Sequence, residues 1–366
     1  MKNSAFAYPA VASHPLRLRD NISIIMASQI SLKPDVRFMR LAIKEAAKAL
    51  GRTAPNPAVG AVIMKNGKVL AKGYHHAAGL PHAEIEALRK LPPTRSKETT
   101  LYVTLEPCSS HGRTPPCTEA IIAAGITRVV YGATDPDKRH RGRAATILKK
   151  KRITVTQGIL EKECAALNAH WNHRATTGMP WVIAKAALSL DGRIDSPPHR
   201  RWITSAGSRK EAMRFRASVD AILVGGGTVR TDDPSLTVRG IKLPKGQPQP
   251  WRVIWSRSGL IPKKCKLLTD AHRDRTILFT GMSLRKVLQE LGKRGVSSIL
   301  IEGGGQTLGA AFKAKLVDEV RFFIAPIIQG GKVPAVSARI SPAHLTDVSY
   351  TRIGSDVMIS GKVKKA

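Results

Sequence analysis

Residues 100–125 read TLYVTLEPCSSHGRTPPCTEAIIAAG and combine a strand-like apolar run, a polar loop and a helix-like run. Cys108 and Cys117 bracket the loop, and His82 opens an earlier helix-like run, HAEIEALRKL. One imidazole and two thiolates make three ligands, and a zinc site with three protein ligands keeps its fourth position for water. The pattern therefore predicts a catalytic zinc site at two helix N-termini, where unpaired backbone N–H groups favour thiolate over thiol.

Glu84 lies two residues after the histidine and is not needed as a ligand. In zinc deaminases, an H-x-E segment followed by P-C and a further cysteine provides the metal ligands and a glutamate that moves protons. Water on such an ion is acidified to a pKa near ~7 and becomes a nucleophile at neutral pH. The alternative, four ordinary buried or surface residues, is disfavoured because the spacing and the strand-then-helix context are satisfied together.

The chain carries 60 Lys and Arg against 26 Asp and Glu, a net charge of +34. Such a balance raises the question of nucleic-acid binding. The basic residues are spread along the whole chain, however, and few aromatic residues interleave with them, so no stacking platform for bases is indicated. We expect solvated basic faces that attract phosphorylated small molecules, and no nucleic-acid partner.

With 366 residues, the chain is long enough for two domains of ordinary size. It contains no apolar run of about 18 residues, so no membrane association is expected. Four cysteines, two of them assigned to zinc, indicate a reducing cytosol rather than a disulfide framework. Residues 1–34 are expected to be a disordered extension, and the location cytoplasmic unless residues 1–25 are an organelle transit peptide.

Helix and strand signals alternate over residues 35–172. Pro34-Asp35 marks the start of a helix that Gly51 ends, and the Asn66-Gly67 dipeptide predicts a hairpin between two apolar runs. The run ITRVVYG, after the zinc segment, predicts a further buried strand. This alternation predicts a three-layer α/β domain with a largely open sheet.

A polar segment with Gly and Pro near its end predicts an interdomain linker at residues 173–180, followed by a second domain at 181–366. Glycine triplets at 225–227 and 303–305 each follow an apolar strand-like run. The second triplet precedes a helix-like run, and helix N-termini bind anions. Neither triplet is a G-x-G-x-x-G, so a Rossmann fingerprint is rejected, but both predict close approach to a cofactor or phosphate.

These residues resemble a known family. HAE at 82–84 and EPCSSHGRTPPC at 106–117 are similar to the deaminase half of the bifunctional deaminase/reductases of riboflavin biosynthesis. Eight residues separate the two cysteines, whereas most zinc nucleoside and tRNA deaminases have a much shorter gap. The likeness extends over about residues 35–360, through ITRVVYGATDP, LSLDGRI, WITS and DDPSLTVR.

The resemblance implies a cytidine-deaminase-like N-terminal domain and a dihydrofolate-reductase-like C-terminal domain, with one Zn²⁺ and NADPH as cofactors. It implies deamination of a small phosphoribosyl-pyrimidine and reduction of its ribosyl group to a ribityl chain, in a homodimer or higher homo-oligomer. The residues implied in the deaminase substrate pocket are Asn56, His75, Arg113 and Asp135. Those implied at the nicotinamide cofactor are Ala187, Trp202, Thr228, Asp232, Ser256, Gly303, Gly304 and Gly305. Those implied at the reductase substrate are Lys185, Asp191, Arg216, Leu236, Arg239 and Glu302, with the two arginines as clamps on its phosphate.

Two positions depart from the family pattern. Ser110 stands where the family usually has His, and Asp137 stands where it usually has Asn. A carboxylate can only accept hydrogen bonds and repels phosphate, so Asp137 bears on substrate affinity. An active reductase half beside an inactive deaminase half therefore stays open, as do a nucleobase or tRNA deaminase fused to a reductase, and an RNA-binding protein.

Overall fold

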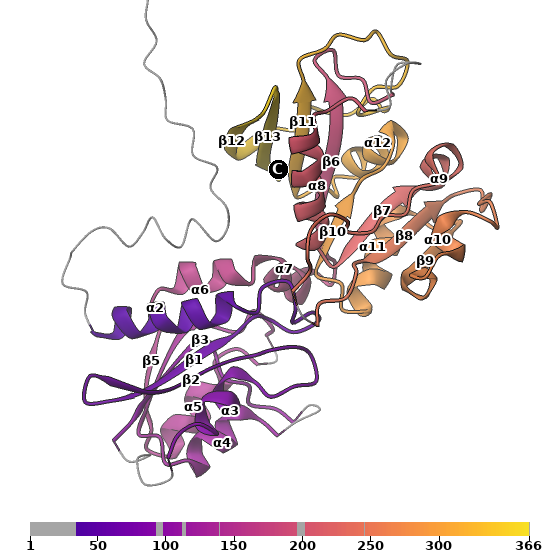
Figure 1. Cartoon of the computed structure of the whole chain (residues 1–366). Coiled ribbons are helices and arrows are strands. Elements are labelled where there is room, and N and C mark those ends of the chain that lie inside the picture. Colours follow the sequence, from indigo (N-terminus) through magenta and orange to yellow (C-terminus); the bar gives the residue numbers. More distant parts are fainter. Residues whose placement is uncertain are drawn as a thin grey trace, which may run out of the picture.

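The computed structural model describes residues 34–92, 98–111, 115–138, 140–195, 202–244 and 246–365, and these form two α/β units with separate sheets (Figure 1). The extension expected at residues 1–34 lies outside the described residues except for Pro34. In the described part of the chain, no helix is both long and apolar enough to cross a membrane.

The first unit has a five-stranded sheet in the order β2-β1-β3-β4-β5. Strand β1 is antiparallel to β2 and β3, while β3, β4 and β5 run parallel. The strands are β1 (Gly60–Lys65), β2 (Lys68–Tyr74), β3 (Thr100–Leu105), β4 (Arg128–Ala133) and β5 (Thr154–Gln157). Helices α2 (Pro34–Ala47) and α6 (Glu161–Leu167) cover one face, and α3 (Ala83–Leu88), α4 (Cys117–Ala123) and α5 (Arg143–Lys150) cover the other (Figure 1). The predicted three layers are confirmed.

Local signals placed the start of the first helix and the hairpin correctly, but the helix ends at Ala47 and a turn separates it from Gly51, where the sequence predicted its end. Helix α2 begins at Pro34, and its apolar side chains, including Met39 and Ala46, are buried against the sheet. Asn66 and Gly67 both have positive φ, 49° and 74°, as the two central residues of a type I′ hairpin turn require. The structure thus confirms the predicted hairpin between β1 and β2.

Helix α3 lies unusually close to strand β2. A Cβ atom added to Gly73 would come within 2.5 Å of the Ala87 backbone nitrogen and 2.8 Å of the Glu86 Cβ. Distances under about 3 Å are far below van der Waals contact, so this crossing requires a residue without a side chain. The first turn of α3 is therefore held at a fixed height above the sheet.

A partly buried polar contact ties α2 to the sheet. The Arg128 guanidinium donates to both oxygens of Asp35, at 2.9 and 2.7 Å, and the Tyr102 hydroxyl donates to the same carboxylate at 2.7 Å. The Arg128 hydrogen bonds hold the pKa of Asp35 below its ordinary value. The acidic residue expected only as a helix-start signal thus also anchors the helix.

The second unit has an eight-stranded sheet in the order β12-β13-β11-β6-β10-β7-β8-β9. Its parallel part runs from β11 to β9, and β13 pairs antiparallel with β11 and β12. The strands are β6 (Trp181–Ser189), β7 (Ala221–Gly225), β8 (Trp251–Ser256), β9 (Thr276–Thr280), β10 (Ser298–Ile301), β11 (Glu319–Ala325), β12 (Leu345–Ile353) and β13 (Asp356–Val363). The helices are α8 (Ala206–Ala217), α9 (Gly226–Asp232), α10 (Lys266–Thr269), α11 (Leu284–Lys293) and α12 (Gly305–Lys313), with a 3-10 turn η2 (Arg273–Arg275).

Both faces of this sheet are buried at its parallel centre, whereas the edge strand β12 is largely exposed. Val182 of β6 packs in one apolar cluster with residues of α11 and α12, while the next residue, Ile183, packs in another with α8 and α9. Parallel strands covered on both faces read as continuous apolar runs, which explains the sequence WVIAKAAL.

The segment that reads as a polar connection forms helix α7 (Ala169–Thr177), and Gly178 ends it with φ 73°. Arg174 joins the two units: its Nε donates to Ser297 Oγ at 2.9 Å, and its Nη2 donates to the Pro55 carbonyl at 2.7 Å. The polar residues of this segment therefore belong to a helix that contacts both units. The assignment of 173–180 as the linker stays a prediction.

Candidate metal and reductase sites

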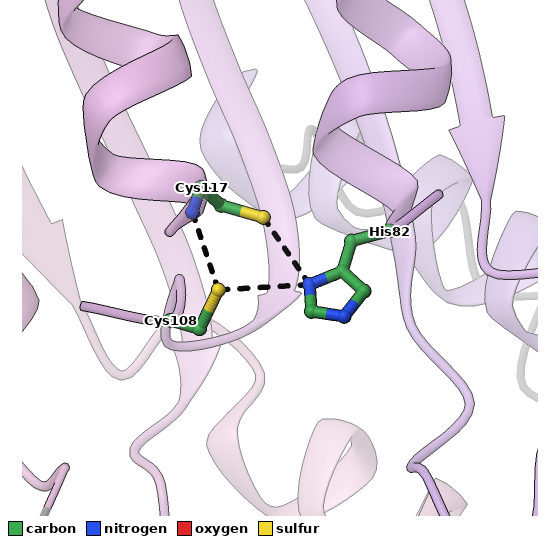
Figure 2. Close-up of side chains that lie close together, drawn as sticks. All are labelled: His82, Cys108 and Cys117. Carbon is green, nitrogen blue, oxygen red and sulfur yellow. Dashed lines mark hydrogen bonds between the residues drawn. The ribbon is translucent and has the colours of Figure 1, made fainter. Parts of the chain in front are cut away.

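The three predicted metal ligands converge beneath the N-termini of two helices (Figure 2). His82 is the N-cap of α3, Cys117 is the first residue of α4, and Cys108 lies in the loop after β3. His82 Nδ1 lies 3.3 Å from Cys117 Sγ and 3.6 Å from Cys108 Sγ. All three ligand atoms lie within 4.8 Å of one another.

This geometry fits a zinc ion. Tetrahedral Zn–S and Zn–N bonds place neighbouring ligand atoms roughly 3.5 Å apart, close to the two distances in the structure. The Cys117 backbone N–H donates to Cys108 Sγ at 3.2 Å. Hydrogen bonds from Cys117 and His82 lower the pKa of Cys108 to about 4, so its sulfur is a thiolate at neutral pH, the form that binds metal.

Glu84 lies beside the ligands on α3 and is 3% exposed. Burial raises the pKa of its carboxyl to about 7, and the negative charge of Cys108 acts in the same direction. A carboxyl group with a pKa near the working pH can both accept and return a proton. The predicted catalytic residue thus has both the location and the acidity that proton transfer needs.

A cavity of about 760 Å³ opens over this site. Asn56 and His75 line it, with Asn56 Nδ2 and His75 Nε2 3.1 Å apart. His75 Nδ1 lies 3.0 Å from the Pro81 carbonyl, which can only accept, so Nδ1 carries the proton and Nε2 accepts from Asn56. Burial lowers the pKa of His75, which keeps the ring neutral. Arg113, predicted in the same pocket, lies outside the described residues.

Asp135 also lines the cavity, at the start of a loop that Glu106 holds in place. The buried Glu106 carboxylate accepts hydrogen bonds from the backbone N–H groups of Asp135, Gly142 and Ala144, at 3.2, 3.0 and 3.1 Å. Sequence reasoning missed this role, although a carboxylate directly after a buried strand and before a metal ligand was a visible signal. Asp137 lies in the same loop, and its backbone N–H donates to Asp135 at 2.8 Å.

In the second unit, the glycine-rich strand ends meet around Thr228 and Ser256. The Gly304 backbone N–H donates to Thr228 Oγ1 at 3.2 Å, and a Cβ on Gly226 would lie 2.8 Å from Ser256 Oγ. A Cβ on Gly227 would meet nothing within 4 Å, so the backbone is open there. The structure thus brings together five of the predicted cofactor residues, Thr228, Ser256, Gly303, Gly304 and Gly305. The open backbone at Gly227, in the first turn of α9, lies beside the N-terminus of α12, and this combination suits the phosphates of a nicotinamide cofactor.

Three predicted substrate residues form a buried charge cluster. Arg216 donates to both oxygens of Glu302, through Nε at 2.7 Å and Nη2 at 2.9 Å, and its Nη1 donates to the Thr237 carbonyl at 3.0 Å. Lys185 Nζ lies 3.9 Å from the same carboxylate. Burial lowers the pKa of Lys185, while Glu302 raises it. Arg216 was expected as a phosphate clamp, and that role stays a prediction. The ion pair with Glu302 already occupies much of its guanidinium.

The remaining predicted residues are more dispersed. The Asp191 carboxylate accepts the backbone N–H groups of Gln329 and Gly330, at 3.2 and 2.9 Å, and so shapes a turn. Leu236 is buried with φ 50°, and Ala187 lies on β6 opposite Phe323. The exposed side chains are those of Trp202, Asp232 and Arg239.

A three-layer domain with a His/Cys/Cys ligand set and a buried glutamate is the arrangement of zinc-dependent deaminases, here joined to a second α/β domain. Residues 32–133 match the model of the cytidine and deoxycytidylate deaminase zinc-binding region, and residues 180–359 match the RibD C-terminal domain. The chain belongs to the RibD family, the bifunctional deaminase/reductases of riboflavin biosynthesis.

Individual relatives cover nearly the whole chain. A riboflavin biosynthesis protein RibD of Bacillus amyloliquefaciens is 37% identical over 357 residues, 88% of this chain and 95% of the relative. RibD of Acinetobacter baumannii has a solved structure with TM-score 0.82 and 33% identity, covering 91% of this chain and 99% of its own. The diaminohydroxyphosphoribosylaminopyrimidine deaminase/5-amino-6-(5-phosphoribosylamino)uracil reductase of Thermotoga maritima has TM-score 0.78 and 32% identity, over 90% of this chain and 99% of its own. The predicted fold class, family and cofactor types are confirmed.

Proposed function

We propose that this chain catalyses two consecutive reactions on one phosphoribosyl-pyrimidine. The first domain hydrolyses the 2-amino group of 2,5-diamino-6-(5-phosphoribosylamino)pyrimidin-4(3H)-one and releases ammonia. The second reduces the ribosyl group of the resulting uracil derivative to a ribityl chain with NADPH. The observation that carries the first step is the buried Glu84 beside the convergent His82, Cys108 and Cys117. The uracil ribotide named for the Thermotoga maritima relative supports the order of the two steps.

In the deaminase site, His82, Cys108 and Cys117 would hold a zinc ion, which would supply a water acidified to a pKa of about 7 as the nucleophile. Glu84 is placed to take the two protons of the attacking water one after the other. It would pass the first to the ring nitrogen and the second to the amine, which leaves as ammonia while the ring carbon keeps the water oxygen as a carbonyl. Burial raises its pKa to about 7, so a single carboxylate can serve both directions.

Pyrimidine binding falls to Asn56 and His75 at the cavity wall. Because Nδ2 of Asn56 donates to His75, the Asn56 carbonyl oxygen stays available to accept from an exocyclic amine of the substrate. Neutral His75 is fixed by the Pro81 carbonyl and does not compete for the proton that Glu84 handles. Asp135, on the loop that Glu106 holds, completes this polar wall.

In the reductase site, the glycine-lined strand ends would bind NADPH, which supplies the hydride. C1 of the ribosyl group, in its open-chain form, would receive that hydride. We assign the accompanying proton to Lys185, because burial lowers its pKa and so lets the ammonium release a proton more readily. The negative charge of Glu302 favours the protonated form of Lys185 before the hydride transfer. Family resemblance alone supports two further proposals, a homo-oligomer and a cytoplasmic location.

The decisive experiment follows ammonia release and NADPH oxidation together, using purified protein, the diaminopyrimidine ribotide, zinc and NADPH. Glu84→Gln should abolish both signals with this substrate, because deamination supplies the reductase. It should leave NADPH oxidation intact when the uracil ribotide is supplied directly. Glu86→Gln, on the same helix but paired with His76 and Lys90 at 3.9 Å each, is the matched control and should retain both activities.

A second candidate function is a reductase with an inactive deaminase domain. The observation that favours it is the carboxylate of Asp137 on the cavity wall, where a phosphorylated substrate meets a like charge. Ser110, also on this wall, has its Oγ 3.2 Å from His140 Nδ1. NADPH consumption by the wild type only with the uracil ribotide would establish this second function. Absence of both ammonia release and NADPH oxidation with either ribotide would refute the assignment to riboflavin biosynthesis.

A further inference from the structure

The charges around the deaminase cavity are unevenly distributed. The carboxylates that line it, Glu84, Glu106, Asp135 and Asp137, belong to the first domain and lie on α3, at the end of β3 and in the loop after β4. Its Arg and Lys side chains, within the described residues, are Arg174, Lys293 and Arg294. A substrate with a neutral base and a phosphate dianion should orient its base toward the metal and its phosphate toward these cations.

Two of the three cations come from the other domain. Lys293 ends α11, and Arg294 and Gly295 follow it in the turn that leads to β10. A Cβ on Gly295 would collide with the side chain of Pro55, so this turn packs directly against the residue before Asn56. The Arg174 bonds to the Pro55 carbonyl and to Ser297 fix the same junction on both sides.

Arg294 is the cation best placed to receive a ligand. Lys293 is paired with Glu290 at 2.7 Å, and Arg174 already bonds two groups of the protein. Arg294 is exposed and, among the described residues, has no carboxylate within 4.0 Å. The C-terminus of α11 would itself repel an anion, so any attraction here must come from the side chain. A planar guanidinium can hold two phosphate oxygens at once.

We propose that Arg294, a residue of the reductase domain, binds the 5-phosphate of the ribotide in the deaminase cavity. The deaminase site is then completed by the second domain rather than contained in the first. The inference rests on the proposed deaminase function and adds to it the group that recognises the phosphate. It also gives a reason for the tight contact between Pro55 and Gly295, which sets Arg294 at the rim of the cavity.

The test compares ammonia release from the ribotide and from the corresponding dephosphorylated riboside. Arg294→Ala should raise KM for the ribotide about tenfold, the typical effect of one lost charge-assisted contact, with kcat nearly unchanged. With the riboside, the variant and the wild type should have the same KM. The reductase kinetics on the uracil ribotide should also stay unchanged, which excludes general damage to the second domain.

The matched control is Arg52→Ala. Arg52 lines a smaller neighbouring cavity of about 200 Å³ at the same domain boundary but does not line the catalytic one. Removing its charge should therefore leave KM for the ribotide unchanged. Arg113→Ala, which removes the cation predicted from family resemblance, measures the competing location for the phosphate.

An unchanged KM in Arg294→Ala, together with a raised KM in Arg113→Ala, would overturn the inference and place the phosphate at the loop between the cysteines. An equal rise in KM for ribotide and riboside would also overturn it, because the loss would then not involve the phosphate. A wild type that releases no ammonia from the ribotide removes the deaminase function itself, an outcome distinct from either of these.

Discussion

Replacing Glu302 by glutamine tests the buried charge cluster of the second domain. The substitution keeps the side-chain shape but leaves Arg216 and Lys185 without their counter-charge, 2.7 and 3.9 Å away. Although burial alone would raise its pKa, the charges of Arg216 and Lys185 lower the pKa of Glu302 to about 2, from an ordinary 4.5. This difference corresponds to roughly 3 kcal/mol of stabilisation, similar to the cost of breaking other buried ion pairs.

The pH dependence of this stabilisation follows from the direction of the shift in the pKa of Glu302. The folded-state pKa lies below the unfolded one, so the ionised carboxylate stabilises the fold above about pH 4.5. The contribution is lost as the pH falls toward 2. We therefore expect Glu302→Gln to lower the free energy of unfolding by about 3 kcal/mol at neutral pH and to flatten its decline between pH 4.5 and 2.

Denaturation by guanidinium, followed by tryptophan fluorescence, is a suitable assay because four of the five tryptophans lie at residues 181–255. Glu290→Gln provides the control, since its ion pair with Lys293 is exposed and should be worth no more than about 0.5 kcal/mol. A loss below about 1 kcal/mol in Glu302→Gln would refute the reasoning. Adding Arg216→Met should recover part of the loss, because no unpaired guanidinium then remains.

Three further predictions concern the first domain. Glu106→Gln should raise KM for deamination about tenfold with normal zinc content. The carboxylate accepts hydrogen bonds from backbone N–H groups of the loop, whereas the NH2 of an amide would face them donor to donor. An unchanged KM would show that the loop does not need this carboxylate. Tyr102→Phe should cost about 1 kcal/mol in thermal unfolding by removing the 2.7 Å bond to Asp35, and no shift in the melting temperature would contradict the anchoring role of that bond. Removal of zinc by a chelator should stop ammonia release and spare NADPH oxidation with the uracil ribotide, and loss of both would argue against independent sites.

The metal site could be predicted because its ligands and its proton-transfer residue lie in two short segments of the sequence. His82 and Glu84 share one helix start, and Cys108 and Cys117 bracket one loop, so the spacing within each segment matches a known ligand pattern, although only the fold brings the two segments together. The hairpin turn was predictable for the same reason, since Asn66 and Gly67 set their own backbone geometry.

Features that depend on distant partners could not be predicted in this way. Arg174 and Ser297 are 123 residues apart, and only the docking of the two domains brings them together. The same holds for Arg216 and Glu302, which are 86 residues apart. From the sequence alone, Arg216 was expected to bind the substrate phosphate, and its ion pair with Glu302 could not be foreseen. Helix α7 was not predicted because its polar composition is typical of a solvent-exposed linker. In the structure, its polar residues contact both domains.

The crossing of α3 over Gly73 makes metal affinity vulnerable at a position that touches no metal ligand. A methyl group at Gly73 would press on the Ala87 nitrogen and the Glu86 Cβ, and the helix would have to rise. Its first residue follows His82, so the imidazole would move away from the two sulfurs while every ligand remained present. Demetallation could thus arise from a single alanine on β2, and loss of zinc in a variant of this protein does not by itself identify a ligand mutation.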